Sequence, residues 1–298
     1  MPFLAISASL MAIMMGISVN FAVKYAADQS VPQHMILFFR LVGGMVFVLP
    51  VMFYYGRRSY VSKAPAIQGL RALMMTLSIA LFFWTISVIP VGVAGAIQNL
   101  SPLFIPIGGL LFLREKFSAG LFLPVFVGLF GAMLATEVSA PSGELFILSV
   151  GVLSAALGGL TAPLGKHLQK YDDLLVMVTW PAFVGISVVS FWCFYAGFSM
   201  PPLLVVLYLS GAGAMGYLGW FLTQWAYQHF SSGVIAPIRY MAIPMNLLGA
   251  MLFFGERFSA TALAGIGLIL LGCLLPWLEP TAIRRQLKRF QRWIGPVK

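Results

Sequence analysis

The sequence predicts an all-α polytopic membrane protein, with ten transmembrane helices arranged as two inverted five-helix repeats. Three observations support this: a weakly charged composition, a series of apolar segments of membrane-spanning length, and a pattern that recurs after 141 residues. Of the 298 residues, 60% are hydrophobic and 9% are charged, whereas soluble domains carry roughly 25% charged residues. One soluble core cannot bury so much apolar surface, so the bilayer is the expected solvent and partner.

Ten apolar segments each approach the ~20 residues that cross about 30 Å of hydrocarbon. Turn or charge signals separate them, as at Ala27-Asp28-Gln29 and Gly56-Arg57-Arg58. The break near Pro90 carries no charge, which leaves a merged pair of spans as the alternative there, but 67–113 is too long for one crossing. The predicted spans are 3–25, 33–55, 67–89, 91–113, 119–136, 144–166, 174–196, 203–228, 233–254 and 260–278.

The positive charges predict the topology. The net charge of +10 is placed between the apolar segments and in the tail, as in membrane proteins with basic cytoplasmic loops, so nucleic acid is not expected as a partner. With the N-terminus inside, fourteen Lys and Arg residues fall on the cytoplasmic side and only Lys24 and Arg257 outside. Both termini are therefore predicted to be cytoplasmic. The basic tail is interpreted either as an amphipathic helix on the inner leaflet or as a topology-fixing segment.

An internal repeat carries the functional prediction. The segments 111–119 and 252–260 both contain Phe-Ser-Ala preceded by a glutamate and a basic residue, at a separation of 141 residues. Five spans per repeat is an odd number, so the two halves must enter the membrane in opposite directions. Inverted repeats suit alternating access. We therefore predict a first repeat at 1–139, a second at 140–280, and a cytoplasmic tail at 281–298.

These features resemble those of the drug/metabolite transporter superfamily, specifically its EamA-type transporters. The residues that carry the resemblance are Gly16 and Lys24, Phe39-Arg40-Leu41, Glu115, Glu256, and Pro237-Ile238-Arg239-Tyr240. One departure is that Gln98-Asn99 stands in the first repeat where Arg239-Tyr240 stands in the second. The resemblance implies a transporter in the bacterial inner membrane, not an enzyme, and it leaves the substrate open. Glu115 and Glu256 are interpreted as caps or ion-pair partners.

Two arginines within spans are the leading candidates for substrate binding. Arg40 and Arg239 lie six or seven residues from a span end, roughly 10 Å deep at a rise of about 1.5 Å per residue. All eight acidic residues fall in predicted loops or near span ends, so a substrate carboxylate could supply the missing partner. The same pattern argues against a proton relay through a buried acid. The alternative is that both side chains snorkel to an interface or bind backbone carbonyls.

Further candidates are neutral or aromatic. The amides of Asn20, Gln98, Asn99 and Asn246 could bind substrate or hold helices together. The rings of Trp84, Trp180, Tyr217 and Tyr240 could wall a cavity or pack against neighbouring helices. No catalytic residue, metal site or cofactor is predicted, because Cys193 and Cys273 lie in apolar segments without metal-ligand spacing.

The leading functional hypothesis is export of a small amino-acid-derived or other anionic or zwitterionic metabolite. The alternative within the same class is uptake or exchange of a vitamin or an S-adenosylmethionine-like compound. A remote alternative is an intramembrane lipid-modifying enzyme, but His34, His167 and His229 fall on different segments. The expected partners are the small-molecule substrate and the bilayer, and the protein is expected to be a monomer or homodimer.

Overall fold

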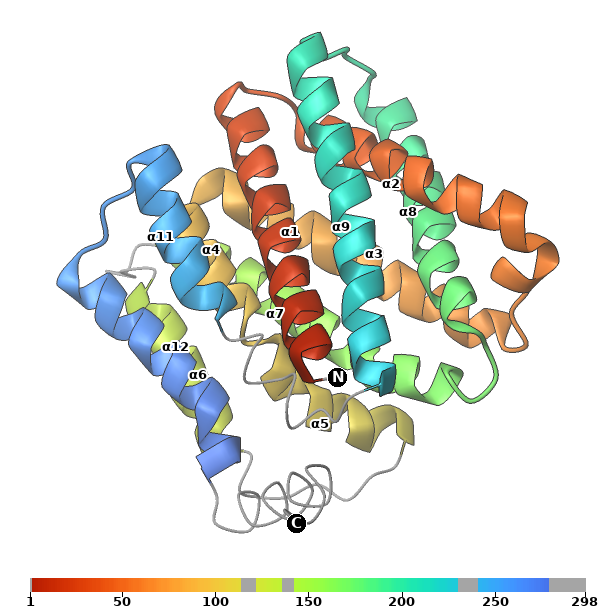
Figure 1. Cartoon of the computed structure of the whole chain (residues 1–298). Coiled ribbons are helices and arrows are strands. Elements are labelled where there is room, and N and C mark those ends of the chain that lie inside the picture. The colour runs from red at the N-terminus through yellow and green to blue at the C-terminus, as the bar shows by residue number, and fades with distance from the viewer. Residues whose placement is uncertain (1, 114–121, 136–141, 230–240, 279–298) are drawn as a thin grey trace.

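The helices of the first half follow the predicted apolar segments. The computed structural model describes residues 2–113, 122–135, 142–229 and 241–278 (Figure 1). This half contains α1 (Pro2–Asp28), α2 (Gln33–Tyr55), the short 3-10 helix η1 (Gly56–Ser59), α3 (Pro65–Val88), α4 (Val91–Gln98), α5 (Ser101–Leu113) and α6 (Phe122–Ala135).

The second half repeats this order in its described helices, and the counterpart of α4 falls in 230–240, outside the described residues. It contains α7 (Ser142–Leu168), α8 (Leu174–Ala196), α9 (Leu203–His229), α11 (Ala242–Phe254) and α12 (Ala260–Leu278). In the described part of the chain, seven helical stretches are long and apolar enough to cross a membrane, and three shorter apolar helices accompany them. These correspond one for one to the ten predicted segments, and the described residues contain no strand. The all-α polytopic fold class is confirmed.

The fourth predicted span, 91–113, is not one continuous helix. It divides into α4 and α5 at a turn formed by Asn99 and Leu100. Pro102, in the first turn of α5, has no N–H to donate, and its ring would clash with the carbonyl of residue 98 in a continuous helix. The Asn99 side chain also donates to the carbonyl of Gly95 at 2.7 Å, at the end of α4. The turn places polar groups inside the bundle.

The helix bounds reproduce the repeat distance found in the sequence. Both ends of α2 and α8 are 141 residues apart, and the same holds for α5 and α11. The packing is also paired, because α1 lies along α9 and the equivalent α7 lies along α3. Five segments in each half make the halves inverted relative to one another. The domain division at 139/140 stays a prediction, and the tail 281–298 lies outside the described residues.

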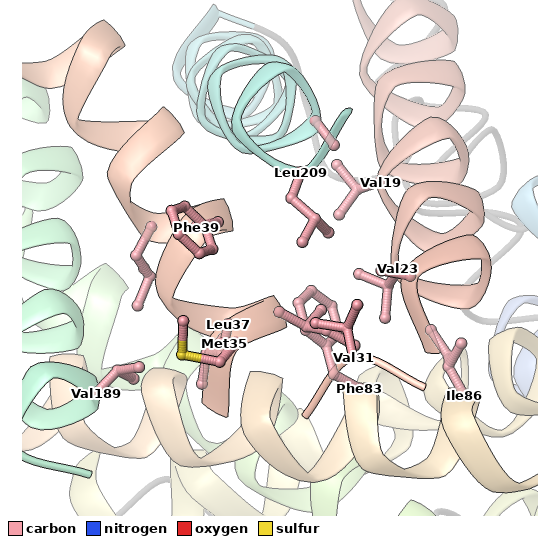
Figure 2. Packing of buried hydrophobic residues seen from close by; sticks show 14 of the residues in the cluster. Val19, Val23, Val31, Met35, Leu37, Phe39, Phe83, Ile86, Val189 and Leu209 are labelled. Atoms are coloured by element: carbon pink, nitrogen blue, oxygen red, sulfur yellow. The ribbon is translucent and has the colours of Figure 1, made fainter. Parts of the chain in front are cut away.

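The larger apolar core lies between the two halves. It joins α1, α2 and α3 to α8 and α9, and Figure 2 shows Val23, Phe83 and Leu209 pointing toward one another. A smaller core joins α4 and α6 to α12. At the crossing of α2 and α9 the backbones touch, since a Cβ added to Gly213 would overlap the carbonyl oxygen of Arg40. The arginine predicted from the sequence therefore stands at a tight crossing of the two repeats.

Candidate functional site

A cavity of about 130 Å³ lies at this crossing. Its lining residues come from α2, α3, α8 and α9, and several are related by the 141-residue repeat: Arg40 with Pro181, Thr76 with Tyr217, and Ile79 with Trp220. The cavity thus lies where the two halves face each other, which is where inverted-repeat transporters hold substrate. Its lining residues are Leu37, Arg40, Leu41, Met75, Thr76, Ile79, Pro181, Gly216, Tyr217 and Trp220.

Arg40 brings the charge into this cavity, whereas its repeat counterpart is a proline. Its guanidinium carbon lies 5.3 Å from the centroid of the Phe83 ring, a cation–π distance. Its Nε is buried and has no hydrogen-bond partner among the described residues. Two ion pairs are formed among the described residues, Lys24 with Asp28 and Arg58 with Asp173, and neither involves Arg40. A guanidinium without a carboxylate partner has the donors to form charge-assisted hydrogen bonds with an anionic group.

Tyr217 and Arg40 are two predicted site residues that the structure brings together. Tyr217 is 6% exposed and its ring fills the space beside Gly44, where an added Cβ would overlap it. Gly216 leaves room for the arginine, because a Cβ there would lie 3.4 Å from Arg40 Nη2. The small residues on α2 and α9 therefore allow a tyrosine and an arginine to share one cavity.

Four predicted amides meet in a second cavity of about 250 Å³. Phe82 and Thr223 line it, each one helical turn beyond a residue that lines the Arg40 cavity, so the two cavities are neighbours along α3 and α9. The remaining lining residues are Ser9, Ala12, Ile13, Gly16, Ile17, Asn20, Gly95, Gln98, Asn99, Ser101, Ala242 and Asn246. Each cavity is smaller than the roughly 300–1,000 Å³ of drug-sized ligand sites, which favours a small solute.

The amides of this second cavity also hold helices together. Asn20 Nδ2 donates to Asn246 Oδ1 at 3.2 Å, which joins α1 to α11 across the two halves. Ser154 Oγ donates to Gln98 Oε1 at 2.9 Å. Ser9 Oγ is buried without a hydrogen-bond partner among the described residues and lines the same cavity. The predicted interhelical bonding is thus seen for these residues, and their binding of substrate stays a prediction.

The other predicted aromatic and charged candidates are placed elsewhere or lie outside the description. Trp84 packs on Phe146, with ring centroids 5.8 Å apart, and Trp180 Nε1 donates to the carbonyl of Tyr60 at 2.9 Å. Neither is among the residues that line the two cavities. Arg239 and Tyr240 lie outside the described residues.

Arg71 is a residue that sequence reasoning missed, because it is one of the fourteen basic residues that the charge pattern assigns to the cytoplasmic side. The structure buries it on α3 at 3% exposure. Its guanidinium carbon lies 5.4 Å from the Trp220 ring centroid, and its Nη1 donates to the carbonyl of Met177 at 3.3 Å. Its position inside the predicted span 67–89, one turn after a second polar residue, Gln68, was the available signal.

Glu256 caps a helix of the opposite repeat, as its predicted capping role requires. Gly255, with φ +63°, ends α11 in the left-handed conformation that suits glycine. The carboxylate of Glu256 then accepts hydrogen bonds from the backbone N–H groups of Val91 at 2.8 Å and Gly92 at 3.3 Å. These are the first residues of α4, where a negative charge is favoured. Glu115 lies outside the described residues.

Replacing Glu256 with alanine is expected to lower the stability of the folded protein by about 1–2 kcal/mol, the range for loss of a helix cap. Glu256→Gln should lose less, because an amide oxygen still accepts one of the two bonds. Thermal unfolding in detergent would measure the difference. Asp28→Asn is the matched control, since its carboxylate is half exposed and pairs with Lys24 at 3.3 Å. Equal melting temperatures for Glu256→Ala and wild type would contradict the capping role.

Comparison with known proteins gives one family and several relatives. The model of the EamA-like transporter family matches residues 3–136 and again residues 145–277. A pseudopaline exporter of Pseudomonas aeruginosa is 26% identical, over 86% of this chain and 90% of its own. An S-adenosylmethionine uptake transporter of Rickettsia bellii is 24% identical, over 79% of this chain and 80% of its own. A solved crystal structure at 14% identity and TM-score 0.61 covers 94% of this chain and 98% of its own, which shows a shared fold.

Proposed function

The chain belongs to the EamA-like transporter family, and from this premise we propose that it exports a small amino-acid-derived or other anionic or zwitterionic metabolite across the bacterial inner membrane. It is a multi-pass membrane transporter, not an enzyme. Under the proposal both termini are cytoplasmic, as the positive-inside distribution of Lys and Arg requires. The two inverted halves alternate, exposing the site between them first to one side and then to the other.

The observation that carries the substrate class is the unpaired guanidinium of Arg40. It lines a cavity shared by both halves, and no carboxylate of the described residues pairs with it. A charge within a membrane span is costly unless it is paired. A substrate carboxylate pairs with it and offers two oxygens to the fork of N–H groups.

The second cavity supplies neutral contacts to the rest of the solute. Asn99 and Gln98 at the α4–α5 turn, and Asn20 and Asn246 opposite them, offer donors and acceptors for hydrogen bonds. Arg239 and Tyr240 belong to the proposed site through their sequence positions. The oligomeric state is proposed to be a monomer or a homodimer.

The proposed coupling of export is facilitated diffusion or a route through His34 or loop carboxylates, and exchange is the coupling of the second candidate below. Four carboxylates among the described residues form a hydrogen bond or an ion pair, and all four lie at helix ends or in turns. They belong to Asp28, Asp172, Asp173 and Glu256. None of these four lines the two cavities. This arrangement disfavours a proton relay through a buried acid at the substrate site.

Uptake or exchange is the second candidate, and the Rickettsia relative named for S-adenosylmethionine uptake favours it. S-adenosylmethionine also carries an α-amino-acid head, so the same Arg40 contact serves either direction. Proteoliposomes loaded with a metabolite panel separate export from exchange. Efflux that continues without external solute supports export, whereas flux that requires solute on both sides supports exchange.

The same panel tests the proposed function. Carboxylate-bearing amino-acid derivatives are expected to cross faster than their amides or amines of equal size. Liposomes without protein and liposomes with the Arg40→Gln variant provide the baselines. Absence of flux for every carboxylate-bearing solute in the panel would overturn the substrate class.

Arg239→Gln is expected to lower transport by about tenfold or more, as loss of a charged hydrogen bond to substrate does, without loss of expression or folding. Initial rates in proteoliposomes, set against the amount of protein reconstituted, measure this. Arg257→Gln is the matched control, since that residue lies in a predicted outer loop. Unchanged kinetics for Arg239→Gln would remove it from the proposed site.

A further inference from the structure

A second group of buried polar side chains lies on α3, outside the residues that line the Arg40 cavity. Gln68 is 0% exposed and Arg71 is 3% exposed, and their spacing of three residues makes them neighbours on the helix surface. Both reach Met177 on α8. Gln68 Nε2 donates to Met177 Sδ at 3.7 Å, and Arg71 Nη1 donates to the Met177 carbonyl at 3.3 Å. Two polar side chains therefore meet at one point on the opposite repeat.

Each side chain leaves one buried atom unsatisfied. Gln68 Oε1 and Arg71 Nε have no hydrogen-bond partner in the described part of the chain. Buried polar atoms are nearly always paired, so the missing hydrogen bonds of these two atoms call for an explanation. The two atoms are opposite in kind, because Oε1 accepts and Nε–H donates. An α-amino-acid head group satisfies both: its ammonium donates to Gln68, and its carboxylate accepts from Arg71.

Trp220 connects this group to the Arg40 cavity. Its ring centroid lies 5.4 Å from the guanidinium carbon of Arg71, and the same residue lines the cavity. Met75, one helical turn after Arg71 on α3, lines the cavity as well. Gly165 on α7 packs closely against Arg71, since a Cβ there would lie 3.3 Å from Arg71 Nε. Trp220 thus lies between a solute in the cavity and the side chains that carry the two unsatisfied atoms.

We propose that Gln68 and Arg71 form a second subsite, which binds the ammonium and carboxylate of an α-amino-acid head group, with Trp220 as the wall it shares with the Arg40 cavity. This rests on the proposed transport function and narrows its substrate class to zwitterionic amino-acid derivatives. The unsatisfied atoms are buried in this conformation, so the subsite fills when the Trp220 side chain moves as the halves alternate. A purely structural role for Arg71, as a tie to Met177, leaves both unsatisfied atoms unexplained.

The test uses the head group and its two parts as probes. Full-length protein labelled with 5-fluorotryptophan is titrated with glycine, acetate and methylamine, and the ¹⁹F signal of Trp220 is assigned with a Trp220→Phe variant. Glycine is expected to shift this signal saturably, with an affinity about tenfold higher than that of acetate, as for one added hydrogen bond to a charged donor. Methylamine should leave it unchanged. The signal of Trp84, which packs on Phe146, is the internal control.

Two variants separate the roles of the two side chains. Because Trp220 also lines the Arg40 cavity, both variants are made in an Arg40→Gln background, in which Arg71→Gln should abolish the response to both glycine and acetate. Gln68→Leu should keep the acetate response and reduce the glycine affinity to that of acetate. If Arg71→Gln fails to fold, as seen by collapse of the other tryptophan signals, Gln68→Leu decides alone. No Trp220 shift in wild type, or equal glycine shifts in wild type and both variants, overturns the subsite.

This outcome is independent of the flux measurements. A glycine response that requires Arg71, found in a protein that moves no carboxylate-bearing solute, would keep the subsite and overturn the proposed transport function. Carboxylate flux that depends on Arg40, in a protein whose glycine response is the same with and without Arg71→Gln, would keep the function and overturn the subsite.

Discussion

Arg40→Gln is expected to lower kcat/KM for carboxylate-bearing solutes by about 30-fold or more, because truncating one partner of a buried charged pair costs about 2 kcal/mol or more. The folded protein should not lose stability, since Arg40 Nε has no partner among the described residues to be left unpaired. Removing an uncompensated charge from a membrane span relieves a desolvation cost. Initial rates in proteoliposomes and a melting curve in detergent measure the two quantities on the same preparation.

Two further arginine variants define the role of Arg40. Arg40→Lys keeps the charge but not the planar fork of donors, so its rate should fall between those of wild type and Arg40→Gln. Arg58→Gln is the matched control, because that side chain is 77% exposed and pairs with Asp173 at 2.7 Å, an exposed pair that contributes little. Equal rates for Arg40→Gln and Arg58→Gln would show that Arg40 does not contact substrate.

Gly213→Ala is expected to abolish transport, because the added methyl group would overlap the carbonyl oxygen of Arg40 at the α2–α9 crossing. The Gly44 N would also lie 3.0 Å from that methyl group. Backbone atoms cannot rotate away as a side chain can, so the two helices must separate and Arg40 must move with α2. Overpacking of this kind destabilises proteins by about 1–3 kcal/mol. Transport rate and melting temperature should therefore fall together.

Gly211→Ala provides the matched control for this prediction. It lies two residues earlier on α9, and an added Cβ there meets nothing within 4 Å. It should even stabilise the helix slightly, as alanine does relative to glycine. If Gly213→Ala transported as well as Gly211→Ala, the tight crossing would not be what positions Arg40.

The helices could be predicted closely from the sequence. The predicted spans 33–55 and 174–196 coincide with α2 and α8, because apolar runs of this length with polar ends have one stable arrangement in a bilayer. The break in the fourth span was not predicted. Its signal is local, because Pro102 follows the polar turn residue Asn99 by three residues. The turn is stable, however, only where neighbouring helices satisfy the freed polar groups.

The candidate site was predicted in part. Arg40 and Tyr217 share one cavity, and Asn20, Gln98, Asn99 and Asn246 line its neighbour. Trp84 and Trp180 line neither cavity. Polarity within an apolar span indicates that a side chain faces protein, but it does not indicate which other helix it faces.

The sequence by itself determines that this chain spans the membrane as two similar halves. Composition, charge placement and the 141-residue repeat suffice for this, because the membrane spans depend on the contact of each segment with lipid and water. Only the tertiary structure decided that Arg40 stands where the halves cross and that Arg71 is buried beside Trp220. Arg71 lies four residues inside the predicted span 67–89, a depth from which an arginine can either snorkel to the surface or turn inward. The choice is made by Met177 and Trp220, from helices more than 100 residues away in the sequence.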